Sequence, residues 1–193
     1  MIMTDIVIAG IGQTPVGEHW DMSLRSLAFQ AIQAAIQDSG GLKPQALYVG
    51  NMLAANLSHQ AHLGALLADY AGLTGIEAET VEAGGASGGA ALRQGYLAVA
   101  SGLVDVALVA GVEKYTDVIG PDLEAALATL TDADYESIHG LTLTAQAALI
   151  ARRYMLENHV PADGLAGFPL TAHANGAGNK NAMYRKAIAL DLY

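Results

Sequence analysis

The sequence predicts an α/β protein built on a largely parallel sheet that helices cover on both faces. Three observations support this fold class. Short apolar runs alternate along the chain with longer amphipathic segments, as strands and helices do in parallel sheets. The runs are apolar at successive positions, as expected for strands buried on both faces. Small residues are abundant, with 22 glycines and only 6% aromatic residues, which favours close packing of helices on the sheet.

The elements follow in order from the N-terminus. The segment "DIVIAGIGQTP" (5–15) is rich in β-branched residues and ends in glycine and proline, which predicts a buried first strand. Ser23 opens an amphipathic stretch that Gly40 ends, which predicts a helix. The other expected elements are strands at 46–53, 79–83 and 105–115 and helices at 62–73 and 90–100. We expect the third and fourth strands to be neighbours and the last of these helices to be buried.

Past Thr116 the composition changes. An acidic, loop-rich segment is followed by one more amphipathic stretch, "TAQAALIARRYMLENHV", and then by a segment rich in Asn and Gly. We expect a sheet core over about 1–115 and a covering lobe over about 116–187, both within a single domain of residues 1–193.

Charge and cysteine content exclude several classes of function. The net charge of −10 argues against nucleic-acid binding, which needs a basic surface. The absence of cysteine excludes disulfides and thiol catalysis in this chain. No signal peptide is recognised, and Ser101, Gly102 and Asp105 interrupt the most apolar region, so no membrane span is expected. A cytoplasmic protein is the expectation.

The stretch "VEAGGASGGAALRQGYLAVASG" (81–102) reads as a strand, a glycine-rich corner and a helix. A dinucleotide site is disfavoured, since Gly10 and Gly12 lack the third glycine and the acidic residue that the motif requires. A phosphate loop fails because Lys-Ser or Lys-Thr follows neither glycine cluster.

A serine hydrolase is the sharper alternative. Gly85-Ala86-Ser87-Gly88-Gly89 spells the G-x-S-x-G of a nucleophile elbow. The partners available to such a nucleophile are Asp105, His139, His159 and His173. The favoured interpretation is structural: Ser87 caps the following helix by accepting a hydrogen bond from an exposed N–H group.

Residues 81–118, "VEAGGASGGAALRQGYLAVASGLVDVALVAGVEKYTDV", resemble the core of thiolases, especially the sterol-carrier-type and archaeal acetyl-CoA acetyltransferase branch. In that family the corner reads E-A-A-C-A-S-G-G. "VAGIGQTPVG", "HLGALLADYAGL", "ARRYM" and "HANGAGNKNAMYRKAI" extend the similarity over nearly the whole chain. The resemblance implies a thiolase-type half: a mixed, mostly parallel five-stranded sheet with helices on both faces and a covering loop and helix lobe.

Two departures from the family stand out. The nucleophilic cysteine, which attacks the acyl-CoA thioester in thiolases, falls at Gly85. The family's C-terminal half, which supplies the remaining catalytic histidines and a second cysteine, is absent from residues 1–193. The resemblance implies that the backbone around the missing nucleophile remains as a cradle, in which Gly84, Gly88 and Gly89 permit a ligand to approach the backbone closely at a helix N-terminus.

The lobe holds further candidates. The resemblance places His173 and Asn175 near the substrate tunnel, although a histidine that bonds the backbone is an equal alternative. Lys180 and Arg185 are candidates for contact with coenzyme A phosphates, and a solvated basic face is the alternative. His59 and His62 lack a clear third ligand, so no metal site is expected.

Four functions remain open. The first is a thiolase-like acyl-CoA acyltransferase domain, inactive alone because of Gly85 and the missing half. The others are a cysteine-less acyl-CoA-binding or retro-aldolase subunit, a non-catalytic interaction protein, and a hydrolase using Ser87. Coenzyme A or acyl-CoA is expected as substrate, with no covalent cofactor. The expected partners are a second copy of the chain and a separate C-terminal half or other protein.

Overall fold

A computed structural model describes residues 5–193, and these residues form two compact units. The first holds His19–Ala126 with the preceding residues up to Thr14, and the second holds Leu127–Tyr193 together with Pro15–Glu18. These units are defined by compactness alone, and the division into core and lobe stays a prediction.

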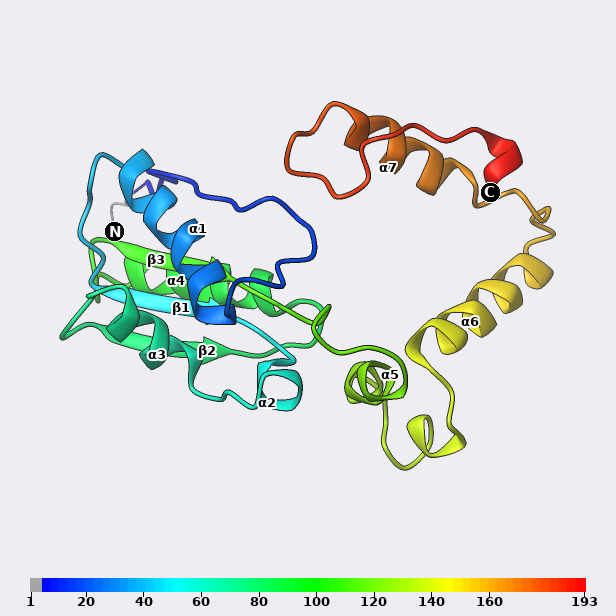
Figure 1. Ribbon diagram of the computed structural model, residues 1–193, viewed down its shortest axis with the longest axis horizontal. Coiled ribbons are helices and arrows are strands. Elements are labelled where there is room, and N and C mark those ends of the chain that lie inside the picture. Colours follow the sequence, from blue (N-terminus) through cyan, green and yellow to red (C-terminus); the bar gives the residue numbers. More distant parts are fainter. Residues whose placement is uncertain (1–4) are drawn as a thin grey trace. The chain divides into compact units, whose positions relative to one another are not determined.

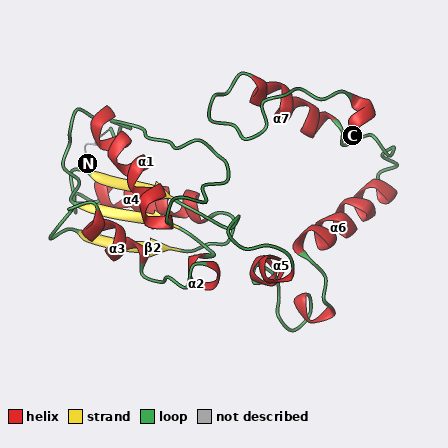
Figure 2. Ribbon diagram, in the orientation of Figure 1, coloured by secondary structure: helices red, strands yellow, loops and turns green. Residues whose placement is uncertain are grey.

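A parallel sheet organises the first unit (Figures 1 and 2). Its strands are β1 (Ala46–Gly50), β2 (Glu77–Val81) and β3 (Ala107–Gly111), in the order β2-β1-β3. Both pairings are parallel, and Gly50 pairs with Val81 on one side and Gly111 on the other. Every residue of β1 is buried, as its continuous apolar run requires. The predicted α/β class with a parallel sheet is confirmed.

The sheet has a helical layer on each face. On one face α1 (Leu24–Asp38) and α3 (Leu63–Tyr70) pack over Leu47 and Val49. On the other face α4 (Ser87–Ala100) packs over Ala46 and Tyr48. The short helix α2 (Ala54–Leu57) follows β1. This alternation of side chains between faces is the two-residue period of a strand.

The predicted first strand is wrong. Residues 5–15 form no strand, and positions 10–12 pack against α1, where the amide of Ile11 donates to the Asp38 carboxylate at 2.9 Å. A Cβ at position 12 would lie only 2.1 Å from the Ala31 carbonyl oxygen, so Gly12 is what permits this approach. The apolar side chains of the segment stay exposed, Val7 by 77% and Ile8 by 79%. The apolar composition of this segment therefore does not show that it pairs with another strand.

The strand order also differs from the expectation. The third and fourth predicted strands, β2 and β3, flank β1 instead of pairing with each other. Within residues 5–193 the sheet has three strands, all parallel, where the family resemblance implied five.

Helix α4 is half-buried rather than buried. Its contact face toward the sheet consists of small residues: Ser87, Ala91, Gly95 and Ala98. The opposite side exposes Leu92 and Tyr96, each by 54%. Small side chains therefore mark one face of this helix and do not show that both faces are covered.

The second unit is mainly helical. It contains α6 (Leu143–Glu157), whose N-terminus is capped by the Thr142 hydroxyl accepting from the Ala145 amide at 3.1 Å. It also contains α7 (Gly167–Ala177) and two 3₁₀ turns, Ser137–His139 and Leu190–Leu192, while α5 (Pro121–Ala128) bridges the end of the first unit and the start of the second. No residue of α6 or α7 is buried. None of the helices in residues 5–193 is long and apolar enough to cross a membrane.

Tyr48 gives the folded protein a dependence on high pH. Burial, the hydrogen bond of its hydroxyl to Glu77 at 2.8 Å and the nearby carboxylates raise the pKa of Tyr48 to about 12. The unfolded chain loses this proton at its ordinary pKa of about 10. Stability from this group is therefore complete below pH 10 and is lost as the pH rises through about 12.

We expect Tyr48→Phe to remove much of the fall in melting temperature between about pH 10 and pH 12. Thermal unfolding across this range measures the effect. Tyr135→Phe is the matched control, since the Tyr135 side chain is 79% exposed. An unchanged pH profile in Tyr48→Phe would contradict the assignment.

Candidate functional site

The glycine-rich corner lies at the carboxyl edge of the sheet. Residues 82–86 connect the end of β2 to the start of α4, so the corner lies beside the exits of parallel strands. This edge is where open parallel sheets place their ligands. The first-turn amides of Gly88 and Gly89 have no intrahelical acceptor, because an α-helix leaves its first N–H groups free of such bonds.

Ser87 stabilises the corner through two hydrogen bonds to its backbone. Its hydroxyl accepts a hydrogen bond from the Ala83 amide at 3.0 Å and donates to the Gly84 carbonyl at 2.6 Å. The side chain is buried, with the residue only 6% exposed. The expected helix cap is therefore wrong: Ala86 is the N-cap of α4, without a side-chain bond, and Ser87 bonds backward to the loop.

Removal of this hydroxyl should loosen the corner. We expect Ser87→Ala to lower the free energy of unfolding by about 0.5–1.5 kcal/mol, because the part-buried hydrogen bond from the Ala83 amide is lost. Urea denaturation measures this, with the exposed Ser58→Ala as the control.

A fluorophosphonate probe should leave Ser87 unlabelled, since the hydroxyl proton is held by a carbonyl group rather than a base. Stoichiometric labelling at Ser87 would instead support the hydrolase.

Position 85 is open. Gly85 is exposed, and a Cβ atom built on it would have nothing within 4 Å. Gly88 and Gly89 are equally open, whereas Gly84 has a φ of 58° that favours glycine. The fold therefore accommodates a side chain at position 85 and presents it at the edge of the corner.

The close approach in this region is made by a different glycine, Gly50 at the end of β1. A Cβ there would lie 2.7 Å from the Ser87 carbonyl oxygen and 2.9 Å from Gly88 Cα. The start of α4, where the corner ends, thus rests directly on the central strand because position 50 carries no side chain.

Two polar residues beside the corner were missed from the sequence. Asn51 is 6% exposed, and its side-chain amide donates to the Val112 carbonyl at 2.8 Å and to Glu113 at 3.0 Å. The other carboxylate oxygen of Glu113 accepts from the amides of Met52 at 3.1 Å and Leu53 at 3.0 Å. The available signal was position: Asn51 follows directly on the buried strand β1, and Glu113 lies two residues after the end of β3.

The remaining hydrolase partners do not converge on Ser87 within the first unit. Asp105 precedes β3 and so lies at the amino edge of the sheet, opposite the corner, where its amide donates to Gln45. His139, His159 and His173 belong to the second unit. His59 and His62 have positive φ angles of 50° and 63°. Within residues 5–193, no group of three or more His, Cys, Asp or Glu residues is arranged to hold a metal ion.

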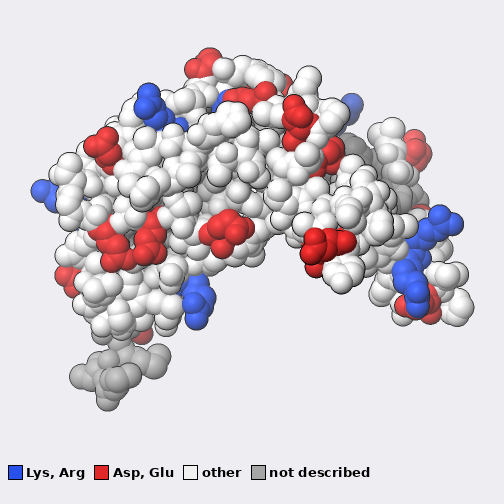
Figure 3. All heavy atoms as spheres, turned by 90° about the horizontal axis from the view of Figure 1, so that it is seen from below, with Lys and Arg blue, Asp and Glu red and all other residues white. Residues whose placement is uncertain are grey.

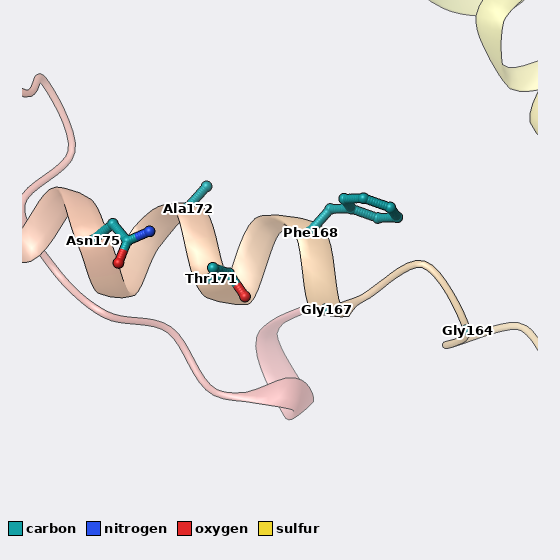
Figure 4. A pocket seen from close by; sticks show the side chains of 6 residues that line it. All are labelled: Gly164, Gly167, Phe168, Thr171, Ala172 and Asn175. Atoms are coloured by element: carbon teal, nitrogen blue, oxygen red, sulfur yellow. The ribbon is translucent and has the colours of Figure 1, made fainter.

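The lobe candidates lie on or just after α7. His173 contacts the Lys186 carbonyl through Nδ1 at 3.1 Å and stacks on Tyr184, with ring centroids 6.0 Å apart. Asn175 lines an open hollow of about 460 Å³ (Figure 4). The other residues that line it are Gly164, Gly167, Phe168, Thr171 and Ala172. Lys180 and Arg185 are exposed in the segment that follows α7.

Comparison with known proteins assigns the family. Residues 6–189 match the family described as "Thiolase, N-terminal domain". The chain belongs to this family. The thiolase domain is 41% identical over 191 residues to the acetyl-CoA acetyltransferase of Methanothermobacter thermautotrophicus, covering 98% of the chain and 49% of that relative. It is 40% identical to the acetyl-CoA acetyltransferase of Methanocaldococcus jannaschii, covering 98% of the chain and 48% of the relative.

A third relative is named as a subunit. Benzoylsuccinyl-CoA thiolase subunit BbsB of Thauera aromatica is 30% identical over 190 residues, with 96% of the chain and 47% of that protein covered. The thiolase domain therefore spans about half the length of the curated relatives it matches.

Solved structures agree on the fold. The acetyl-CoA acetyltransferase from Syntrophomonas wolfei superposes with a TM-score of 0.68 at 20% identity, covering 88% of the thiolase domain and 46% of that chain. A structure titled "Ltp2-ChsH2(DUF35) aldolase" superposes with a TM-score of 0.70 at 24% identity, covering 95% and 47%. The arrangement of β1, β2, β3 and their helices is thus shared with half of each of these chains.

Proposed function

We propose that this thiolase domain is part of an acyl-CoA acyltransferase of the acetyl-CoA acetyltransferase or 3-ketoacyl-CoA thiolase type, and that it is inactive alone. The observation that carries the proposal is the open corner at Gly85. A strand-to-helix turn holds position 85 exposed beside the N-terminus of α4, the placement that lowers the pKa of a thiol and activates it. Glycine at this position cannot take an acyl group, so the cradle is kept without its nucleophile.

The rest of the corner suits a thioester. The N–H groups of Gly88 and Gly89 lie in the first turn of α4, where a helix stabilises negative charge. They are available to the oxyanion that forms when a thioester carbonyl is attacked. Gly84, with its positive φ, lets the chain turn tightly before this point.

The lobe is the proposed contact for coenzyme A. The hollow along α7 is lined by Phe168 and Asn175, which combine an aromatic face with an amide. Lys180 and Arg185, exposed next to α7, would pair with phosphate groups. His173 would lie near the bound substrate, and the Lys186 carbonyl would orient its ring. Coenzyme A thioesters are available in the cytoplasm, where we place the protein.

Two protein partners are proposed. A C-terminal thiolase half would cover the apolar outer side of α4, where Leu92 and Tyr96 are exposed. A second copy of the chain would pair through β2, which forms an edge of the sheet described for residues 5–193. The net charge is −10, and the face visible in Figure 3 shows Asp and Glu side chains spread widely and Lys and Arg in small separate groups, with no continuous basic tract on that face. Nucleic acid is therefore not among the proposed partners.

A second candidate follows from Gly85 itself. A domain without the nucleophile can serve as an acyl-CoA-binding or retro-aldolase subunit beside a partner chain. The relative named as a thiolase subunit shows that a chain of this family can be one component of a larger assembly. In this second function the domain still binds coenzyme A, but it forms no acyl-enzyme.

Acetoacetyl-CoA thiolysis and coenzyme A binding test both candidates, and a gain of thiolysis by Gly85→Cys mixed with the C-terminal half would favour the first. We would assay the purified chain alone and mixed with the C-terminal half of the Methanothermobacter acetyl-CoA acetyltransferase, and titrate each sample with coenzyme A by calorimetry. The main proposal expects coenzyme A binding without thiolysis in both samples. Acetyl-CoA release above background by the unsubstituted chain alone would overturn it, because another nucleophile would then be at work. Absence of any coenzyme A binding would overturn both candidates.

A further inference from the structure

The carboxyl edge of the sheet contains a hydrogen-bonded assembly that the proposed chemistry does not use. Asn51 and Glu113, here called the edge tie, link the segments that follow β1 and β3. The Glu113 carboxylate accepts three hydrogen bonds, from the Asn51 side chain and the Met52 and Leu53 amides. A carboxylate this fully bonded fixes the backbone around it.

Asn51 extends the tie toward the corner. Its own backbone amide donates to the carbonyl of Val81, the last residue of β2, at 3.2 Å. Its side-chain oxygen accepts from the Ala54 amide at 3.0 Å, so one buried residue joins β2, the residue that follows β3 and the start of α2. The corner begins directly after Val81 and returns to rest on Gly50, the neighbour of Asn51.

We propose that Asn51 and Glu113 are positioning residues that set the place of the corner, and with it the direction in which a side chain at position 85 points. The inference rests on the proposed function, since it concerns the geometry of that same corner. The tie is connected to both ends of the corner: the Asn51 amide bonds Val81, where the corner leaves the sheet, and the preceding residue Gly50 packs against Ser87 and Gly88, where the corner enters α4. The internal bonds of Ser87 keep the loop between these points as one body.

A reporter thiol at position 85 tests the proposal without an assay of thiolysis. Iodoacetamide alkylation of Gly85→Cys, measured against pH, gives the apparent pKa of the new thiol, expected below the free value of about 8.5. We then compare Glu113→Gln in the same background. Removal of a nearby negative charge would by itself lower the thiol pKa and speed alkylation. Displacement of the corner from the helix N-terminus would raise the thiol pKa and slow it.

The positioning role therefore predicts slower alkylation in Glu113→Gln, by about 3- to 10-fold at pH 6.5, which corresponds to a rise of roughly half to one pKa unit. Glu113→Asp keeps the charge with a shorter reach and should be intermediate. Glu79→Gln is the matched control, because it makes the same charge change on an exposed residue of β2. Alkylation in Glu113→Gln that is unchanged or faster would overturn the proposal, as would an equal slowing in Glu79→Gln.

Amide hydrogen exchange gives a readout that does not depend on the thiol. Without Glu113, exchange at Ala83 and Ala86 should rise, while exchange at the far end of α4 stays as it was. Near-UV circular dichroism shows whether each variant is folded, and Glu113→Asp serves if Glu113→Gln is not. An ordinary thiol pKa in Gly85→Cys would count against the proposed chemistry of the corner. Unchanged exchange at both amides in a folded Glu113 variant would count against the tie.

Discussion

Gly85→Cys, mixed with a C-terminal thiolase half, is expected to thiolyse acetoacetyl-CoA at least about 10³-fold faster than the unsubstituted chain in the same mixture. The substitution alone should yield no thiolysis. Groups that act as a unit contribute little singly, and the acid–base residues that the family supplies from its other half are outside residues 1–193. The measurement is release of acetyl-CoA with and without the added half.

Gly88→Cys is the matched control for this experiment. A Cβ at position 88 also meets nothing within 4 Å, and the residue also lies at the start of α4. Its thiol should therefore be reactive toward iodoacetamide and yet give no thiolysis, since position 88 lies within the first turn of α4, whereas position 85 lies in the loop before it. Equal activity from Gly88→Cys would show that the position of the thiol in the corner is unimportant.

Gly50→Ala is expected to destabilise the fold more than any other single methyl group added near the corner. The new Cβ would lie 2.7 Å from the Ser87 carbonyl oxygen and 2.8 Å from the Ser87 carbonyl carbon. Both atoms belong to backbone, which cannot rotate away as a side chain can. Overpacking of this kind costs about 1–3 kcal/mol, and we expect the upper part of this range. Urea denaturation gives the free energy of unfolding.

Gly89→Ala is the control for the added methyl group. Its Cβ would meet nothing within 4 Å, and alanine favours a helix over glycine by up to about 1 kcal/mol. This variant should be as stable as the unsubstituted chain or more so. If Gly50→Ala proved equally stable, the corner would not rest on β1 as described.

The sequence predicted best where one residue type and one local pattern decide the outcome. The apolar run 46–53 contains β1, and Ser23 caps α1 by accepting from the Ser26 amide at 3.2 Å. Family membership followed from motifs spread along the chain and was confirmed over residues 6–189.

The errors concern partners, which a local pattern does not specify. Segment 5–15 has the composition of a strand, but a strand needs a neighbouring strand to pair with, and positions 10–12 pack against α1 instead. The position of Ser87 at the start of a helix predicts a cap, yet its hydroxyl bonds backward into the loop. The Asn51–Glu113 tie joins residues 62 positions apart, and only the order β2-β1-β3 brings them together.

The small residues beneath α4 have a consequence for how such a site evolves. A Cβ at Gly95 would lie 2.6 Å from Val109 Cγ2, so the side chain at position 95 sets the height of the helix above β3. Ser87 and Gly95 are about 12 Å apart along the helix, at 1.5 Å per residue. Because α4 continues directly from the corner, a helix lifted at position 95 carries position 85 with it. A mutation at residue 95 would therefore act as a remote adjustment of the site, and descendants with identical corner sequences would still differ in where they hold the reacting group.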